Sequence, residues 1–416
     1  MSLDSPRYEL SNFPNTSQDE KRIFHNFANF SVSSIAGQFS SPFWERRVLQ
    51  ISLSESCVRN AVVAIGALHE NFNKQSLLTT GHQDSQSCTF ALRHHAMATR
   101  DLARLLSASQ QWDLALTACI LFVCFENFLG NHQASLTHLR AGLHILRCIH
   151  EAGTTLSESW KKEFSPLLMR LGIQACLFLD PREDGQRAAL WEDLQIAVPE
   201  NPLISFKTIE DGLWSLSSIG AGMICDRGQT QVAPTLEIRE KHRAHLNIWE
   251  QSLREFLSNA DTHDPVIDST LRGAATLKIF QILICITGEL YERSETHLEE
   301  MLIYCESVDS GQLTYHGSPR PMCNFSTDLG TIAPVFFVAL KSHNPVTQTR
   351  AWKLLKRSHR REGMWDSEIC AGIVENSMAA FPLSNKGDHK LDEILLAGRL
   401  INEEDVLRPK NSIWVT

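Results

Sequence analysis

Apolar residues recur at steps of three and four through most of this chain, and that spacing constrains the fold more than any other feature. Between residues 53 and 72 they form one stripe along a helix, at Val58, Ala61, Val62, Ile65, Leu68 and Phe72. Ser52 and Glu55 have the spacing of a capping box, in which a hydroxyl and a carboxylate accept from unpaired backbone amides. The pattern predicts an amphipathic helix that begins near residue 53 and buries one face.

The same period predicts helices over most of the remaining chain. The segments 91–106, 112–130 and 131–153 follow one another with short connections, which favour antiparallel packing of neighbouring helices. Further helices are predicted near 160–179, 208–224, 236–258, 269–293, 295–306, 329–341, 346–359, 366–380 and 390–407.

Two segments interrupt this pattern. Residues 180–207 and 309–328 are predicted to be irregular, and the best candidate for a strand is the short run 193–200, which Pro199 closes. No segment alternates convincingly between apolar and polar residues. The sequence therefore predicts an all-α fold, a single large multi-helix assembly of antiparallel helices with no substantial sheet.

No shift in composition divides the 416 residues into separate units. We predict an N-terminal tail over residues 1–20 and one helical domain over residues 21–410. Lys and Arg total 39 against 48 Asp and Glu, so the chain lacks the basic footprint of a dedicated nucleic-acid-binding domain.

Eleven cysteines are scattered along the chain, and no two have the two-residue gap of a zinc-ligand pair. Most lie in apolar runs, where cysteine behaves as a small hydrophobe, so we expect free thiols in a reducing, intracellular compartment. The first residues have no signal-peptide pattern. The apolar runs 115–125 and 277–286 are shorter than the ~20 residues of a membrane-spanning helix, so we expect a soluble protein that binds no membrane.

Standard enzyme motifs are missing from the sequence. It contains no GxxxxGK[ST] phosphate loop, no GxSxG nucleophile elbow and no HExxH metal motif. The GxG at Gly220–Gly222 follows a helical pattern and not a strand, which argues against a nucleotide site. We therefore expect no cofactor.

Histidines are the main residues left to consider. His94 and His95 are adjacent on a predicted helix, so their side chains point about 100° apart and cannot share one ligand position. One of them should lie at the edge of the core, where a polar group either meets a partner or lines a cavity. His242 and His245 could face one metal ion, but the neighbouring sequence supplies none of the further ligands that zinc needs. Solvated or hydrogen-bonded histidines are therefore the favoured interpretation of that pair.

The segment KLLKRSHRR, residues 353–361, has two interpretations. Clustered Lys and Arg are typical of a nuclear-import signal, whereas cations in the last turn of a helix complement its dipole. Leu354 and Leu355 interrupt the basic run, which favours the end of an amphipathic helix.

Several segments resemble, in the same order, the fungal-specific transcription-factor domain, the helical regulatory region that usually follows a binuclear zinc cluster. They are 43–70, 139–146, 167–180 and 328–367, and the resemblance spans roughly residues 20–410. The last segment is similar to the late signature of that family, which implies a structural motif at Arg360, Arg361, Glu362 and Trp365. We expect Arg361 and Glu362 to join helix ends, so that their loss destabilises the fold.

The resemblance implies a regulatory or coregulatory protein, nuclear or cytoplasmic, linked to a fungal secondary-metabolite pathway. Family members typically carry six clustered cysteines that hold two zinc ions, whereas Cys57, the first cysteine here, lies inside a predicted helix. We therefore expect no metal site, no zinc cluster and no direct nucleic-acid binding. The expected partners are proteins or a small-molecule ligand.

Two alternatives stay open at this point. One is a repurposed, cofactor-independent pathway enzyme, a cyclase, isomerase or dehydratase that uses a cavity between helices. Its candidate catalytic residues are His94, His95, Tyr315, His316 and Cys323, the last three from the long irregular stretch 309–328. The other is a truncated family member that has lost its zinc cluster.

Overall fold

The computed structural model describes residues 16–77, 85–108, 111–153, 156–179, 184–199, 202, 206–230, 235–261, 264, 266–290, 294–310 and 325–380. Within these residues the fold is all-α, as predicted. The first eight helices are α1 Gln18–Asn26, α2 Val32–Ala36, α3 Val48–Ser54, α4 Ser56–Leu77, α5 Ser85–Ala108, α6 Trp112–Leu129, α7 His132–Glu151 and α8 Leu156–Phe178. The others are α9 Asp184–Leu194, α10 Ile209–Thr230, α11 Leu236–Ser258, α12 Ile267–Thr287, α13 Glu295–Ser310, α14 Ile332–Lys341, α15 Pro345–Ser358 and α16 Ser367–Ala380. The predicted helix 390–407 lies outside the described residues.

The predicted capping box at Ser52 and Glu55 is wrong. Ser52 is fully buried within α3, and its hydroxyl donates to the Leu49 carbonyl oxygen at 2.7 Å. Glu55 has extended backbone angles, so one helix ends at Ser54 and the next begins at Ser56. A capping box does occur earlier in the chain, where Ser17 and Glu20 cap α1, close to the predicted start of the helical domain.

Helices α6 and α7 form the antiparallel hairpin that the short connection predicts. Gly130 ends α6 in the left-handed conformation with φ of 72°, and the Asn131 side chain accepts from the Ala134 amide to begin α7. By length and composition, α6 and α12 could cross a membrane, but 83% and 61% of their apolar windows are buried inside the fold.

The stretch 180–207 is more regular than predicted. Helix α9 occupies Asp184–Leu194, and Leu190 and Leu194, four residues apart, are fully buried. Gln195–Ala197 form a 3-10 turn, so the predicted strand at 193–200 is wrong. Buried positions at Leu194 and Ala197 are three residues apart, which suits a helical turn and not a strand.

The basic run 353–361 lies at the end of a helix, as the two leucines within it predict. Helix α15 stops at Ser358, with Lys356 and Arg357 in its last turn and Leu354 and Leu355 buried. Helix α12 is shorter than the predicted 269–293 because it ends at Thr287, and the residues after it make backbone turns back to the helix.

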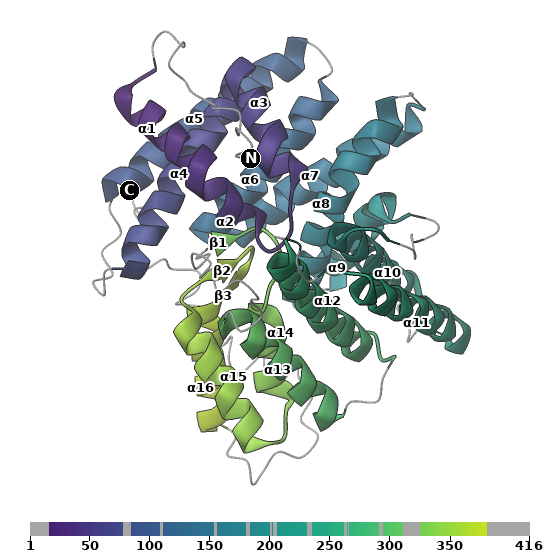
Figure 1. Cartoon of the computed structure of the whole chain (residues 1–416). Helices are drawn as coiled ribbons and strands as arrows, with labels where there is room; N and C mark the ends of the chain where they lie inside the picture. The colour runs from purple at the N-terminus through teal and green to yellow at the C-terminus, as the bar shows by residue number, and fades with distance from the viewer. Residues whose placement is uncertain are drawn as a thin grey trace.

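Buried apolar side chains form three clusters. The largest extends from α1 to α10, the second joins α12 to α16, and the third joins α10 to α12. Helix α12 contributes to the last two, through Ile282 on one side and Leu277 on another. Figure 1 shows α12 between the α10–α11 pair and the α13–α16 group. The second and third clusters therefore share one helix as a wall.

Three two-residue strands lie where these groups of helices meet (Figure 1). They are β1 Phe325–Ser326, β2 Arg361–Glu362 and β3 Trp365–Asp366, with β1 parallel to β2 and β2 antiparallel to β3. Phe325 belongs to the largest apolar cluster and Trp365 to the second. The late signature thus supplies two strands of a small sheet that connects two cores, and the small size of this sheet agrees with the prediction of no substantial sheet.

Candidate functional site

His94 is a buried, hydrogen-bonded side chain on α5. Its Nδ1 lies 3.0 Å from Asn60 Oδ1, and its Nε2 lies 3.8 Å from Glu20 Oε1. Burial lowers the pKa of the imidazole, against the opposing charge of Glu20. His94 therefore meets a partner at the edge of the core, which is one of the two roles expected for it, and it lines neither of the hollows described below.

His95 lies against the aromatic side of α6. Its ring stacks on Phe125 with 4.1 Å between centroids and 5° between planes, and Nε2 is 3.9 Å from Glu126 Oε1. Burial, with the nearby charge of His138, lowers the pKa of His95 to about 4, and burial raises the pKa of Glu126. The surroundings thus disfavour charge on both groups, and His95 also lies outside the two hollows.

Acid is expected to destabilise the fold through His69 and His95. Burial lowers the pKa of each to about 4 in the folded chain, against about 6.5 in the unfolded chain. The contribution of these two histidines to the free energy of unfolding is at its maximum above pH 6.5. It decreases as the pH falls from 6.5 towards 4, because in that range only the unfolded chain binds protons at these side chains. Urea unfolding across this range measures the effect. The substitution His95→Gln should flatten the profile, whereas His25→Gln, at an exposed position, should leave it unchanged. A profile unaffected by His95→Gln would contradict this prediction.

The other candidates from the sequence divide into two groups. Tyr315, His316 and Cys323 lie outside the described residues. His242 and His245 lie on α11 with 6.5 Å between their ring centroids, and His242 Nε2 is 2.7 Å from Asp226 Oδ2. His242 is therefore hydrogen-bonded, as the favoured interpretation predicts. Within the described ranges, no group of three or more His, Cys, Asp or Glu could hold a metal ion.

Arg361 connects β2 to the end of α6. Its guanidinium donates to the carbonyl oxygens of Asn127 at 3.2 Å and Phe128 at 2.8 Å, and it pairs with Asp366 at 2.6 Å. Asn127 and Phe128 belong to the last turn of α6, where carbonyls lack the amide partner that the next turn of a helix would supply. The expected contact between Arg361 and a helix end is therefore present.

Glu362 makes the equivalent contact at the start of α14. Its carboxylate oxygens accept from the backbone amides of Gly330, Thr331 and Ile332 at 3.0, 3.1 and 2.9 Å. Arg360 Nε lies 3.1 Å from the same carboxylate, which is almost completely buried. A negative charge at a helix N-terminus is favourable, since the unpaired amides point towards it.

Trp365 completes this motif by packing. Its ring lies 5.5 Å from Phe178, edge to face, and 5.8 Å from Phe336. These contacts join α8 and α14 across β3. The four residues of the motif therefore contact helix ends and aromatic side chains, and they line neither hollow.

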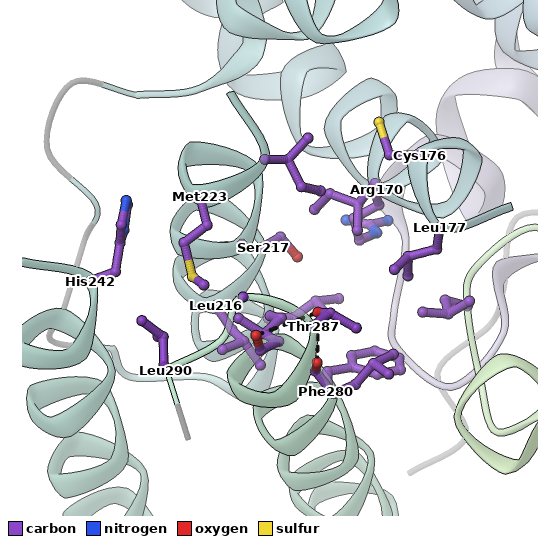
Figure 2. A pocket seen from close by; sticks show the side chains of 18 of the residues that line it. Arg170, Cys176, Leu177, Leu216, Ser217, Met223, His242, Phe280, Thr287 and Leu290 are labelled. Carbon is purple, nitrogen blue, oxygen red and sulfur yellow. Dashed lines mark hydrogen bonds between the residues drawn. The ribbon is translucent and has the colours of Figure 1, made fainter. Parts of the chain in front are cut away.

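A largely apolar cavity of about 150 Å³, which we call the inner cavity, lies among α8, α10, α11 and α12 (Figure 2). It is partly open, and its apolar wall includes Ile173, Leu177, Leu213, Leu216, Phe280, Leu283, Ile284 and Leu290. Phe39, from the segment after α2, and Leu329, from the segment after β1, also line it. The inner cavity therefore touches parts of the chain that are far apart in sequence.

Charged side chains surround the inner cavity at several points. Arg170, on α8, donates to Asp328 at 2.9 Å. Arg187 lies over the Trp191 ring, with 5.2 Å from its guanidinium carbon to the ring centroid. Arg239 comes from the first turns of α11, and its Nε is buried with no hydrogen-bond partner in the part of the chain that the structure describes.

A second hollow, which we call the outer groove, has a volume of about 570 Å³ and lies on the opposite face of α10. Asp226, Lys241 and His245 line it, and His242 lines both the outer groove and the inner cavity. Burial lowers the pKa of His242 despite its hydrogen bond to Asp226. The lining of the outer groove is thus more polar than that of the inner cavity.

The cysteine thiols that border the two hollows are not poised as nucleophiles. Cys176 lines the inner cavity and Cys225 lines the outer groove. Burial raises the pKa of each thiol to about 12, so neither is a thiolate near neutral pH. Two inert thiols therefore border the hollows.

Sequence reasoning missed the inner cavity. One signal was present, because Arg170 is the single charge in the apolar run 164–179. A buried charge needs a partner, so a lone arginine in such a run indicates a polar contact inside the fold. Its partner, Asp328, is 158 residues away, and no local pattern connects the two.

These features define a helical domain with an internal cavity and no reactive thiol at its described walls. Residues 22–179 match the family model of the fungal specific transcription factor domain. The matched region includes 43–70 and 139–146, whereas the late signature at 328–367 lies beyond it.

A relative is also found among characterised proteins. Over 131 residues, 31% of this chain, the sequence is 28% identical to the aspercryptin biosynthesis cluster-specific transcription regulator atnN of Emericella nidulans. The aligned part covers 20% of that regulator, so the chain spans about a fifth of its length. No solved structure matches this chain.

Proposed function

We propose that this protein is a regulatory or coregulatory protein of transcription, linked to a fungal secondary-metabolite pathway, with the helical body as its regulatory domain. The match of residues 22–179 to the fungal specific transcription factor domain carries this proposal. The similarity to a regulator of a biosynthesis cluster supports the link to secondary metabolism. The domain acts in the nucleus, through protein partners or a small-molecule ligand.

No observation favours the enzyme alternative. His94 and His95 are held by neighbouring side chains away from both hollows. The cysteines that border the hollows are kept protonated by burial. We therefore propose no catalytic residue.

Deletion of the gene in the organism that encodes it tests the proposal. Transcripts of a secondary-metabolite gene cluster are expected to change several-fold, and reintroduction of the wild-type gene should restore them. A fluorescent fusion expressed from the native locus should accumulate in the nucleus. Unchanged transcripts from every such cluster, under conditions in which the protein is expressed, would overturn the proposal.

A further inference from the structure

The inner cavity has the size and lining of a site for a small apolar molecule. Its volume of about 150 Å³ equals that of engineered protein cavities that hold benzene. Figure 2 shows Leu216, Ser217 and Phe280 among the side chains around this space. The largely apolar lining favours burial of an apolar ring or a short chain, because that burial removes its surface from water.

The charges around the inner cavity are unequal in sign. Three arginines line it, Arg170, Arg187 and Arg239, whereas Asp328 is the one carboxylate among the described lining residues. Arg170 and Asp328 neutralise each other, at 2.9 Å and with both side chains more than four-fifths buried. An anion would therefore complement the charge of Arg239, whose Nε has no hydrogen-bond partner in the part of the chain that the structure describes.

An unpartnered hydrogen-bond donor points to the same chemistry. Arg239 Nε is buried without a hydrogen-bond partner in the described residues. A guanidinium can only donate, and leaving a buried donor unpaired is unfavourable. A carboxylate accepts several hydrogen bonds and carries the complementary charge.

We propose that the inner cavity binds a small apolar carboxylic acid of about the size of benzoate, with Arg239 as the partner of its carboxylate. The apolar body fills the space beside Leu216 and Phe280. Phe39 and Leu329 also line this cavity, from the segments after α2 and β1. Binding of the ligand therefore stabilises the packing of α11 against these two segments. The regulatory meaning of this ligand rests on the proposed function.

Calorimetric titration of the purified full chain tests the site, with benzoate and benzamide as the probes. Benzamide has the same shape without the charge. Benzoate is expected to bind saturably at one site and at least tenfold more tightly than benzamide, since a charge-assisted pair with arginine is lost in the amide. No saturable binding of benzoate, or equal affinity for the two probes, would overturn the proposal.

Two variants and a matched control locate the site. Arg239→Gln should reduce the affinity for benzoate to that for benzamide, while retained benzamide binding shows that the cavity is intact. Ser217→Leu, which fills the cavity, should weaken both probes. Arg254→Gln removes an exposed arginine of the same helix and should change neither affinity. Wild-type affinity for benzoate in Arg239→Gln would refute the assignment of this residue.

The binding test and the deletion test fail independently. Benzoate binding is measured on the isolated chain and needs no effect on transcription. If deletion leaves transcripts unchanged but Arg239→Gln loses benzoate, the proposed function is wrong and the binding site is correct. If deletion changes transcripts and the chain binds no benzoate, only the ligand inference is wrong.

Discussion

Replacement of Glu362 by alanine is expected to lower the free energy of unfolding by about 4 kcal/mol. The carboxylate accepts from three backbone amides at the start of α14 and lies beside Arg360. The truncation leaves these donors unpaired in a buried site and removes the charge that complements the helix dipole. Denaturant unfolding, followed by the helical circular dichroism signal, measures the loss.

Two further variants test whether the loss of stability comes from the buried contacts of Glu362 and not from the removal of any glutamate. Glu362→Gln keeps the shape but places an amide group among donors, so its loss of stability should be smaller than that of alanine. Glu368→Ala removes a largely exposed glutamate of the neighbouring helix α16 and should change stability by less than about 0.5 kcal/mol. Equal stability of Glu362→Ala and Glu368→Ala would contradict the structural role of Glu362.

Gly363→Ala is expected to cost about 2–3 kcal/mol. Gly363 has φ of +54°, a conformation that costs a residue with a Cβ roughly 1–2 kcal/mol. A Cβ at this position would also overlap the side chain of Gln174, which is buried and donates to the Thr327 carbonyl oxygen. The Gly363 amide donates to Ser326 at 2.7 Å, so displacement here disturbs the pairing of the small sheet.

Gly372→Ala is the matched control for this prediction. Gly372 lies within α16, and a Cβ there would meet no atom within 4 Å. Alanine should therefore stabilise the fold slightly, by up to about 1 kcal/mol, because glycine is the poorer helix former. Thermal melting of the two variants side by side gives the comparison. A Gly363→Ala variant that melts at or above the wild-type temperature would show that the motif tolerates a side chain.

Much of the secondary structure could be predicted from local patterns. Helix α7 falls where the leucine spacing places it, and α15 ends where its cations and buried leucines indicate. Helix α9 was not predicted, because only Leu190 and Leu194 mark its buried side. A short helix with two buried leucines does not produce a period that can be distinguished from an irregular segment.

The surroundings of the candidate site residues were harder to predict, since their partners come from distant segments. His94 and His95 drew attention as an adjacent pair, yet α5 places them against different neighbours, Asn60 and Phe125. The sequence did not single out Arg239, because a charged residue near the start of a polar helix is common and indicates no particular role. Its interest arises only where α11 meets the inner cavity.

The sequence by itself determined the all-α class, the positions of most helices and the likeness to the fungal transcription-factor family, because these depend on residues near one another in the chain. Only the tertiary structure decided which side chains surround the inner cavity and that Arg239 Nε is buried there without a hydrogen-bond partner among the described residues. Arg170 meets Asp328 across 158 positions of sequence, and Glu362 meets the start of α14 across about 30. Contacts of that range depend on how the helices pack, since the periodicity of a helix fixes which face is buried but not which residue lies opposite.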